Sequence, residues 1–284
     1  MPLNPSLPVI IIPAYNEQAV IKNTLSQLGG GNSSGFQIVV VCNGCEDQTE
    51  SIVREHFPLV YCETLAKSSK ARAIRQAEML DIGFPRLYLD ADIVITETTV
   101  EGLFEHAIAK PEPALLVPHS IAILDNCSCW VQRFYHSWYQ TNFVKQHGFG
   151  AGCYLVNRAG RTRFGDWPDL IADDGFIRTQ FADEETHIVK TQVVHVAAPN
   201  SLWSLLKVKS RSKYGNLQLK RYLADNKVVN RQSSINSGMK FGPESTLSII
   251  DIFIYNTVNA LAFGIAKWHH LTGSFVWHRD NSNR

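Results

Sequence analysis

The feature that most limits how this chain can fold is an alternation, through its first half, of short β-rich runs with amphipathic segments of helical length. This order is typical of βαβ units, in which a helix returns the chain so that successive strands lie parallel. It predicts an α/β fold with a mostly parallel sheet flanked by helices, the first strand stopping at Pro13. The expected strands are residues 7–12, 36–42, 60–62, 86–89 and 114–119, and the expected helices are residues 18–28, 48–57, 69–79 and 99–110.

The composition is that of a folded chain without a polyelectrolyte partner. Of 284 residues, 45% are hydrophobic and 19% charged, which suffices for one large domain or two smaller ones and excludes disorder, collagen and a disulfide miniprotein. The 27 basic and 26 acidic residues leave a net charge of +1, so overall charge does not recruit nucleic acid. The six cysteines and the absence of a signal-like N-terminus predict a reducing, cytoplasmic compartment.

The second half of the chain is organised differently. Aromatic density rises after about residue 125 and predicts a helix, whereas residues 230–244 are polar and contain Gly, Ser and Pro. We expect a domain over residues 1–228, a linker over 229–244, and a C-terminal amphipathic helical segment over 245–284.

The C-terminal segment is not expected to span a membrane. Only fifteen residues between Asp251 and Lys267 are free of charge, whereas a spanning helix needs roughly 20 apolar residues. Ser248, Asp251, Asn256 and Asn259 share one flank of a helical wheel. The segment therefore predicts a helix that either docks on the domain or lies in a membrane interface.

Polar residues follow three of the expected strands. Residues 13–17 (Pro-Ala-Tyr-Asn-Glu) come after the first strand, Asn43 and Asp47 after the second, and residues 90–92 (Asp-Ala-Asp) after the fourth. Ligands of parallel sheets bind beyond the carboxyl ends of the strands. We therefore expect these residues to converge on one edge of the sheet.

The acidic pair Asp90 and Asp92 predicts a metal site. A strand has a period of two, so a strand end would point both carboxylates the same way. Like charges so close need a cation, and Mg²⁺ or Mn²⁺ takes carboxylate oxygen and leaves positions open for phosphates. A solvated, Asp-rich turn is the alternative interpretation.

Charges of opposite sign are segregated later in the chain. Residues 166–185 hold seven acids, including Asp173 and Asp174, and residues 186–224 hold seven bases and no acid, including Arg211 and Lys213. Carboxylates suit a general base, and clustered Lys and Arg suit a diphosphate. A solvated surface is the alternative.

Two further features carry less weight. Cys42 and Cys45 form a C-x-x-C, but no second pair follows at zinc-binding spacing, so buried thiols in a turn are expected rather than a metal site. Gly150 and Gly152 suit either close backbone approach or a tight turn.

Taken together, these motifs resemble those of the family 2 glycosyltransferases with the GT-A fold. The resemblance covers roughly residues 7–220. It is carried by VIIIPAYNEQAVIKNTL (9–25), IVVVCNGCEDQT (38–49), KARAIRQA (70–77), LYLDADI (87–93), GAGCYLVNR (150–158) and GDWPDLIADDGF (165–176).

The resemblance implies a role for each matching residue on the donor side. Residues Pro13, Ala14, Tyr15 and Glu17 would form the nucleoside pocket, with Asn43 and Asp47 at the base, although the family usually has Asp where this chain has Asn43. Arg72 would meet the diphosphate. Asp90, with Ala91, would face the ribose and Asp92 would hold the metal. A late histidine, His195, would be an additional metal ligand; a structural histidine is the alternative.

On the acceptor side, the resemblance makes Asp174 the catalytic base, with Asp173 beside it. Arg211 and Lys213 stand where processive synthases carry Gln-x-x-Arg-Trp, and the absence of that motif argues against processive synthesis.

The function implied is inverting, Mg²⁺- or Mn²⁺-dependent transfer from a nucleotide-diphosphate sugar to the hydroxyl of a sugar or lipid-linked acceptor, in polysaccharide or glycolipid synthesis. The protein would be cytoplasmic, with peripheral contact at the inner face of the membrane. A non-catalytic sugar-nucleotide-binding protein and another nucleotide enzyme, such as a nucleotidyltransferase, are the alternatives. A dehydrogenase is disfavoured because residues 13–17 contain no glycine.

Overall fold

The computed structural model describes residues 3–148, 152–231, 241 and 246–274. The chain forms two compact units: unit 1 is Met1–Ile121, Gly150–Asp169 and Gln180–Val196, and unit 2 is Ala122–Phe149, Leu170–Thr179 and Ala197–Arg284. Most of the proposed linker, 229–244, lies outside the described residues, as does Gly150, so the boundaries at 228 and 245 remain a prediction.

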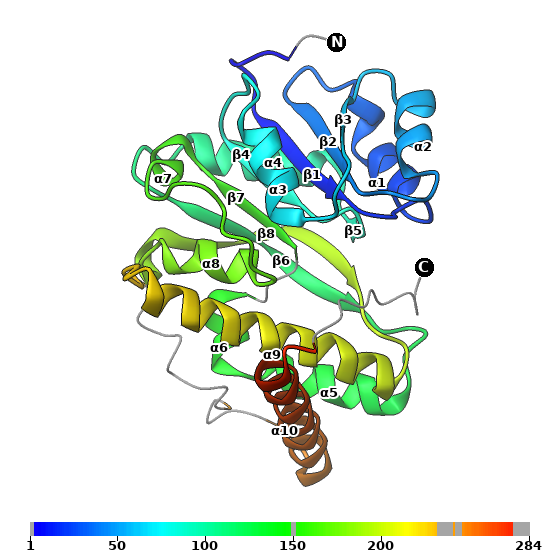
Figure 1. Ribbon diagram of the computed structural model, residues 1–284, viewed down its shortest axis with the longest axis vertical. Coiled ribbons are helices and arrows are strands. Elements are labelled where there is room, and N and C mark those ends of the chain that lie inside the picture. The colour runs from blue at the N-terminus through cyan, green and yellow to red at the C-terminus, as the bar shows by residue number, and fades with distance from the viewer. Residues whose placement is uncertain (1–2, 149–151, 232–240, 242–245, 275–284) are drawn as a thin grey trace. The chain divides into compact units, whose positions relative to one another are not determined.

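The sheet contains eight strands among the described residues, in the order β3-β2-β1-β4-β7-β6-β8-β5 (Figure 1). Strands β3, β2, β1 and β4 are parallel neighbours, whereas β7 is antiparallel to both β4 and β6, and β5 is antiparallel to β8. The expected α/β fold, with helices flanking a sheet and a helical C-terminal part, is confirmed. The sheet is mixed, because its second half contains the antiparallel pairs. The strands are β1 Val9–Ala14, β2 Gln37–Asn43, β3 Tyr61–Leu65, β4 Arg86–Leu89, β5 Ile93–Val94, β6 Leu115–Ile123, β7 Cys153–Val156 and β8 Thr186–Ala197.

The first strand runs one residue past Pro13, where the sequence analysis expected it to stop. Pro13 and Ala14 are paired in register with Val41 and Cys42 of β2. On the other side, β4 pairs with β1 only as far as Ile11. On the β4 side, no strand residue is paired with Pro13. The backbone N–H that proline lacks therefore removes no hydrogen bond between these strands.

Unit 1 packs its helices on the sheet through one apolar core. Buried residues of β1 and β2, such as Ile10, Ile12 and Val40, share this core with Leu25 and Val100 of the helices. Side-chain oxygens of Ser69 and Thr96 accept hydrogen bonds from the third residue beyond them and so cap α3 and α4. The helical elements are α1 Ile21–Gln27, η1 Gly29–Gly31, α2 Thr49–His56, α3 Lys70–Glu78, α4 Glu97–Ile108, α7 Arg158–Arg161 and η2 Asp183–Glu185.

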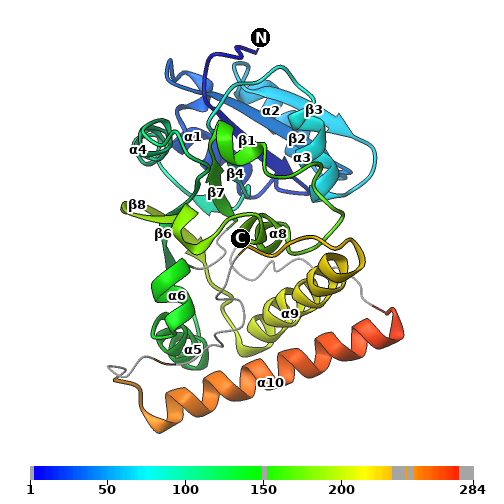
Figure 2. The same cartoon turned by 90° about the vertical axis from the view of Figure 1, so that its left-hand side faces the viewer.

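Unit 2 is helical, and its core is rich in aromatic rings. Phe134 and Tyr255 stack with centroids 5.2 Å apart, and Val131, Leu205 and Val258 complete the centre. The aromatic residues after 125 therefore build a helix core, and α10 lies against α9 and α5 (Figure 2). The helices are α5 Cys129–Tyr139, α6 Asn142–His147, α8 Asp173–Thr179, α9 Leu202–Asp225 and α10 Ile249–Thr272.

Helix α10 turns its acid inward and part of its apolar surface outward. Asp251 is buried, caps the helix with Ser248 and forms an ion pair of 2.9 Å with Arg133 on α5. Phe253 and Trp268 are exposed. The polar flank expected from the helical wheel is thus partly the packed side, because Arg133 neutralises Asp251 there. By length and composition alone, the helix could also cross a membrane.

Candidate functional site

The residues after β1 and β2 form two loops joined by reciprocal hydrogen bonds, which we call the loop seam (residues 14–18 and 45–49). The Glu17 amide donates to Thr49 Oγ1 at 2.7 Å, and the Gln18 amide donates to Asp47 Oδ2 at 3.1 Å. In the opposite direction, the Glu46 amide donates to Asn16 Oδ1 at 2.8 Å. The seam fixes the backbone that carries Tyr15 and Glu17, both half-buried.

Asp47 orders this seam rather than standing free in the loop. Its Oδ1 accepts from the Thr49 amide at 3.0 Å, in the first turn of α2. Its Oδ2 accepts from Gln18, on the neighbouring loop. A carboxylate at a helix N-terminus is favoured by the helix dipole as well as by these hydrogen bonds. Any contact of Asp47 with a nucleotide would therefore be made by a carboxylate already held in place by its protein partners.

Asn43 is similarly engaged with the backbone. Its side chain is buried, its amide donates to the Ala14 carbonyl at 2.8 Å, and its Oδ1 accepts from the Ser69 amide at 3.0 Å. These bonds tie β1 and β2 to the start of α3. Both ends of the carboxamide are occupied, so in this conformation Asn43 positions the pocket, and its expected pairing with a base would require these bonds to be exchanged.

The Asp90-Ala91-Asp92 triplet forms a turn and not a strand end. Strand β4 ends at Leu89, and the Ile93 amide donates to the Asp90 carbonyl at 3.2 Å, which closes the turn. Ala91 is buried, and its carbonyl accepts from Thr24 Oγ1 of α1 at 2.7 Å. The two carboxylates are half-buried. Their placement follows from this turn, so the period-two argument does not apply.

Asp90 is held by a cation and by a glycine. Its Oδ1 lies 2.7 Å from Lys70 Nζ, at the start of α3, and its amide donates to the Gly152 carbonyl at 2.7 Å. A Cβ at Gly152 would lie 2.2 Å from Asp90 Oδ2. Only glycine fits here, also because its φ is +64°.

Asp90 and Asp92 fit a divalent cation that shares its ligands with a substrate. Their oxygens are the hard donors that Mg²⁺ and Mn²⁺ prefer. Within the described residues, no group of three or more His, Cys, Asp and Glu side chains could hold an ion. The set therefore suits a cation that completes its shell with phosphate and water. His195 is exposed on β8 opposite Val94, two residues beyond Asp92.

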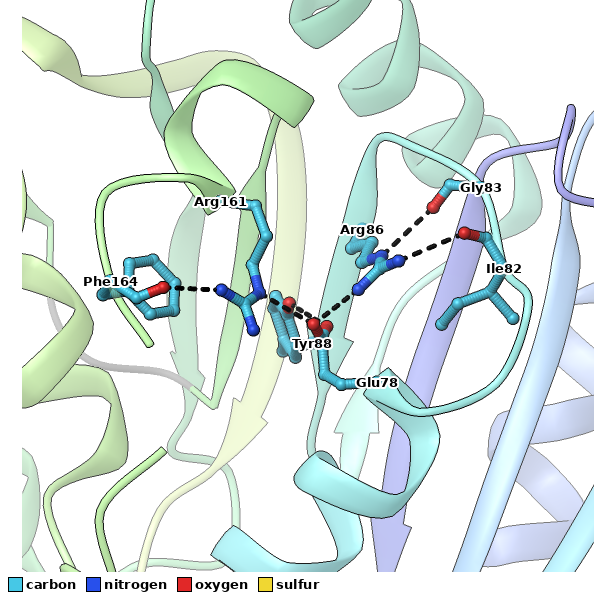
Figure 3. Close-up of polar contacts among 7 residues, drawn as sticks. All are labelled: Glu78, Ile82, Gly83, Arg86, Tyr88, Arg161 and Phe164. Carbon is cyan, nitrogen blue, oxygen red and sulfur yellow. Dashed lines mark hydrogen bonds and ion pairs between the residues drawn. The ribbon is translucent and has the colours of Figure 1, made fainter. Parts of the chain in front are cut away.

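Ion pairs fasten both ends of α3 to β4 and its turn. Beside Lys70 and Asp90 at one end, Glu78 at the other end accepts hydrogen bonds from Arg86 at 2.5 Å, Arg161 at 2.7 Å and Tyr88 at 2.6 Å (Figure 3). The carboxylate lies between the two guanidinium groups, which also donate to backbone carbonyls. This arrangement fixes the strand from which the Asp90 turn emerges.

Arg72, the residue expected at the diphosphate, is exposed on the first turn of α3. Its neighbour Arg75 is instead bonded to the Trp167 carbonyl and to Asp169, at 3.2 Å in the latter case. Asp169 also accepts from Ser69 Oγ at 3.1 Å. Of the cations on α3, Lys70 therefore contacts the Asp90 turn, Arg72 is exposed, and Arg75 has a structural partner.

The second group of site residues is in unit 2, at the start of α8. Asp173 is 4% exposed, whereas Asp174 is half-buried and its Oδ1 accepts from the Gly175 amide at 2.7 Å. Helix α8 sits close to α9, because a Cβ at Gly215 would lie 3.1 Å from the Ala172 amide nitrogen. Burial lowers the pKa of Arg178, and the Asp174 charge opposes that shift.

The cations of α9 are partly covered. Burial lowers the pKa of Lys213, and Arg211 is half-buried. The nearby Lys209 Nζ lies 3.4 Å from the centroid of the Trp138 ring, and burial, followed by the Lys213 charge, lowers the pKa of Lys209 to about 7. Lys209 is therefore part of the aromatic core of unit 2.

Sequence reasoning missed several residues that shape the site: Thr24, Thr49, Ser69, Lys70 and Glu78. Lys70 begins the KARAIRQA motif and could have been identified as the first cation of α3. No local pattern indicates that Thr24 reaches Ala91, since 67 residues separate them.

Comparison with known proteins identifies the family. The model of the family described as Glycosyl transferase family 2 matches residues 9–161, more than half of the chain. The chain belongs to this family. It is therefore a glycosyltransferase, and the matched region contains the loop seam, α3 and the Asp90 turn. No curated protein matches the chain.

Solved structures extend the fold comparison for this family 2 glycosyltransferase. The mannosyltransferase PcManGT from Pyrobaculum calidifontis, in complex with GDP-Man and Mn²⁺, is 18% identical over 97% of this chain and 79% of its own, with a TM-score of 0.60. S. aureus TarS 1-349 with UDP-GlcNAc is 16% identical over 68% of this chain and 58% of its own, with a TM-score of 0.47. The likeness to PcManGT confirms the expected GT-A-like fold.

Proposed function

We propose that this glycosyltransferase moves a sugar from a nucleotide-diphosphate sugar to an acceptor hydroxyl, with inversion, one residue at a time, and with Mg²⁺ or Mn²⁺. The observation that carries the proposal is the meeting of the Asp90 turn, Lys70 and the loop seam at the carboxyl ends of β1, β2 and β4. Two half-buried carboxylates beside a lysine suit a metal diphosphate better than a neutral ligand.

Each group has one task in this mechanism. Tyr15, with Pro13, Ala14 and Glu17, lines the nucleoside side, and Asn43 and Asp47 hold that backbone. Asp92 and Asp90 would hold the metal, with His195 as a further ligand, and when bound the ion neutralises charge on the diphosphate. Lys70 and Arg72, with Arg211 and Lys213, supply cations to the leaving group.

Asp174 is the base and Asp173 its buried neighbour. As the acceptor oxygen bonds to the anomeric carbon, Asp174 takes the hydroxyl proton and the bond from that carbon to the diphosphate oxygen breaks. One displacement inverts the anomeric centre. The acceptor is proposed to be a sugar or lipid-linked hydroxyl in polysaccharide or glycolipid synthesis.

The first test is ligand-induced stabilisation. In a screen of UDP-, GDP-, CDP- and dTDP-sugars, one donor class with Mn²⁺ is expected to raise the melting temperature by several degrees, since ligand at about 100 times its Kd adds ~2.7 kcal/mol of stability. Asp92→Asn should lose the manganese-dependent part of the shift, and the exposed control Asp81→Asn should keep it. If manganese changes no donor's effect on the wild-type chain, the proposed site is wrong.

We also propose peripheral contact of unit 2 with the cytoplasmic face of an anionic membrane. The outward side of α10 exposes Phe253, Leu261 and Trp268, and α9 exposes the bases Lys207, Lys220 and Arg221. Apolar and aromatic side chains beside clustered bases favour a lipid surface over a second copy of the chain, which would bring like charges together. Because α10 packs against α5 and α9, we expect this helix to lie on the membrane rather than to span it.

The membrane proposal predicts binding to vesicles. The double substitution Phe253→Ser/Trp268→Ser is expected to weaken cosedimentation with phosphatidylglycerol vesicles at least tenfold, because burying a large apolar side chain contributes about 1.5–3 kcal/mol. Met79→Ser removes an apolar residue of unit 1 that is still more exposed, and this variant should bind as wild type. Equal binding by the double variant, or a concentration-dependent dimer that the double substitution abolishes, would contradict membrane docking.

A further inference from the structure

A pocket of about 360 Å³ lies within unit 2, and the mechanism proposed above does not use it. The C-terminal half of α9, the last turn of α10 and the segment before α8 line it, and the described lining residues all belong to this unit. Helices α9 and α10 pack together and end on the same side in Figure 2. The volume is at the small end of ligand pockets, which span about 300–1,000 Å³. It suits a compact ligand of the size of a mono- or disaccharide.

The wall that α9 contributes is one face of the helix. Its positions 214, 218, 221, 222 and 225 follow helical spacing, so their side chains share that face. The residues there are Tyr214, Gln218, Arg221, Tyr222 and Asp225. The buried residues of α9 are at positions 205, 215 and 219, on a neighbouring face. The pocket face is therefore distinct from the most buried face of α9, and it is polar and aromatic where the buried face is apolar.

Aromatic rings form part of the pocket wall. Tyr222 packs edge-on against Phe176 of α8, and Tyr214 packs edge-on against His270 of α10, with ring centroids 6.0 Å apart in both pairs. Tyr214, Tyr222 and His270 are half-buried, so the packing fixes each ring while part of it stays accessible. A hexose ring carries a layer of C–H bonds on its face, which packs on an aromatic ring as another apolar surface does. The rings therefore provide the kind of surface on which sugars stack.

Carboxamides supply hydrogen-bonding groups beside these rings. Gln218 Oε1 accepts from the Ile171 amide at 3.4 Å, which orients the side chain, and the same carboxamide has two N–H donors. The Asn226 side chain donates to the Tyr222 carbonyl at 2.9 Å and has an acceptor oxygen of its own. Sugar hydroxyls both donate and accept, so a ligand rich in hydroxyls matches this lining.

The charges of the lining favour a neutral ligand. Arg221 Nε lies 3.5 Å from Asp225 Oδ2, so the two charges cancel. Both side chains are exposed, and an exposed ion pair is weakly held and can exchange its partner for a ligand hydroxyl. A phosphate or carboxylate ligand would be attracted by Arg221 but repelled by Asp225. A neutral saccharide can form hydrogen bonds with both.

The pocket adjoins the segment that carries the proposed base. Leu170 lines the pocket, and the amide of the next residue, Ile171, is bonded to Gln218. Helix α8, which carries Asp174 in its first turn, begins shortly after these residues. At the other end of the pocket face, Arg211 continues the same face of α9 toward its N-terminus. A ligand in the pocket is thus held by the same elements that carry residues proposed to act on the acceptor and the leaving group.

We infer that this pocket binds a neutral mono- or disaccharide and recognises the acceptor through sugar groups other than the reacting hydroxyl. Its role toward the acceptor rests on the proposed function, whereas saccharide binding itself does not. The rings hold the face of the sugar, and Gln218, Arg221 and Asp225 bond its hydroxyls. The α9 face then determines which sugar is accepted, while Asp174 acts on the hydroxyl that reacts.

Saturation-transfer NMR on the full-length chain tests saccharide binding. The probes are the methyl glycosides of glucose, galactose, mannose and N-acetylglucosamine, together with maltose, cellobiose and lactose. At least one probe is expected to bind, and Tyr222→Ala and Gln218→Ala should each weaken its binding about tenfold, the effect of roughly 1.4 kcal/mol of lost contact. The control Asn256→Ala removes an exposed carboxamide of α10 that is not part of the pocket lining, and it should bind as wild type.

The assignment would be overturned if none of these sugars binds, if Gln218→Ala binds as wild type, or if glycerol phosphate binds where no neutral sugar does. Tyr222 also packs against Phe176, so its replacement could lower the melting temperature. In that case Gln218→Ala, which keeps the ring packing, decides the location alone.

Transfer to the saccharide that binds tests its role as acceptor. With a nucleotide sugar as donor, Gln218→Ala should raise the KM for that saccharide about tenfold and leave kcat unchanged, since the lost contact lies away from the reacting oxygen. A saccharide that binds in the pocket but receives no sugar, or equal losses in kcat and kcat/KM, would contradict the acceptor role. A chain that binds no nucleotide sugar would refute the proposed function instead, and the NMR measurement would still decide the pocket.

Discussion

The Asp174→Asn variant is expected to bind its donor normally and to lose about 10²–10⁴-fold in kcat, the usual contribution of a positioned general base. Asparagine has the same shape and keeps an oxygen to accept from the Gly175 amide, which Asp174 does at 2.7 Å. It cannot accept the acceptor's proton. The loss should therefore be confined to the chemical step, which steady-state kinetics and donor calorimetry on the same preparation will separate.

Two further variants show whether that loss belongs to Asp174 itself. Asp125→Asn changes an exposed aspartate of unit 2 and should retain wild-type turnover. Asp173→Asn alters a side chain that is 4% exposed, so its effect should include a lower melting temperature. Undiminished turnover in Asp174→Asn would remove it from the role of base, and a large loss in Asp125→Asn would show that the assay responds to charge in general.

The parallel half of the fold was predictable because its signals are local. Hydrophobic runs bounded by turn residues located β4 at Arg86–Leu89 without error, and Ser69 marked the start of α3. The antiparallel strand β7 was not among the strands expected from hydrophobic runs bounded by turn residues. Its pairing with β4 continues into the hydrogen bond from the Asp90 amide to the Gly152 carbonyl, between residues far apart in sequence. Long-range pairing of this kind leaves no periodicity to detect.

The residue types of the candidate site could be predicted from the sequence, but the hydrogen-bond partners of its side chains could not. Position at or beyond a strand end selected Asp90, Asp92, Asn43 and Asp47 as candidates, because the carboxyl ends of parallel strands meet at one edge. It could not indicate that Asn43 is buried and bonded to Ala14 and Ser69 backbone atoms. Side-chain engagement of this kind depends on tertiary distance, and a polar residue looks the same in the sequence whether it faces a ligand or the backbone.

The α10 segment illustrates a different limit. A helical wheel identified a polar flank that contains Asp251, and polar residues ordinarily face water. Here Asp251 is buried because Arg133, on a helix more than one hundred residues earlier, neutralises it at 2.9 Å. The wheel describes the helix correctly and still cannot assign its faces, since a paired charge can be buried and an apolar face can be left for another partner.

The largest expected effect on stability comes from Glu78→Ala, which should lower the free energy of unfolding by about 3–5 kcal/mol, the usual cost of breaking a buried ion pair from one side. The Glu78 and Arg86 side chains are only 8% and 9% exposed, and Arg161 and Tyr88 also donate to Glu78. Its removal leaves buried donors without their acceptor. Urea unfolding followed by tryptophan fluorescence or circular dichroism measures the change.

Glu78→Gln and Glu101→Ala separate burial from charge in the same experiment. Glutamine keeps an oxygen for Tyr88 but no negative charge for the guanidinium groups of Arg86 and Arg161, so its loss should be smaller than that of alanine. Glu101 is an exposed acid on α4, and its replacement should change stability by no more than ~0.5 kcal/mol. If Glu78→Ala lowers the free energy of unfolding no more than Glu101→Ala does, water must reach Arg86 and Arg161 in the native state. The ion pairs of Glu78 would then not support the Asp90 turn.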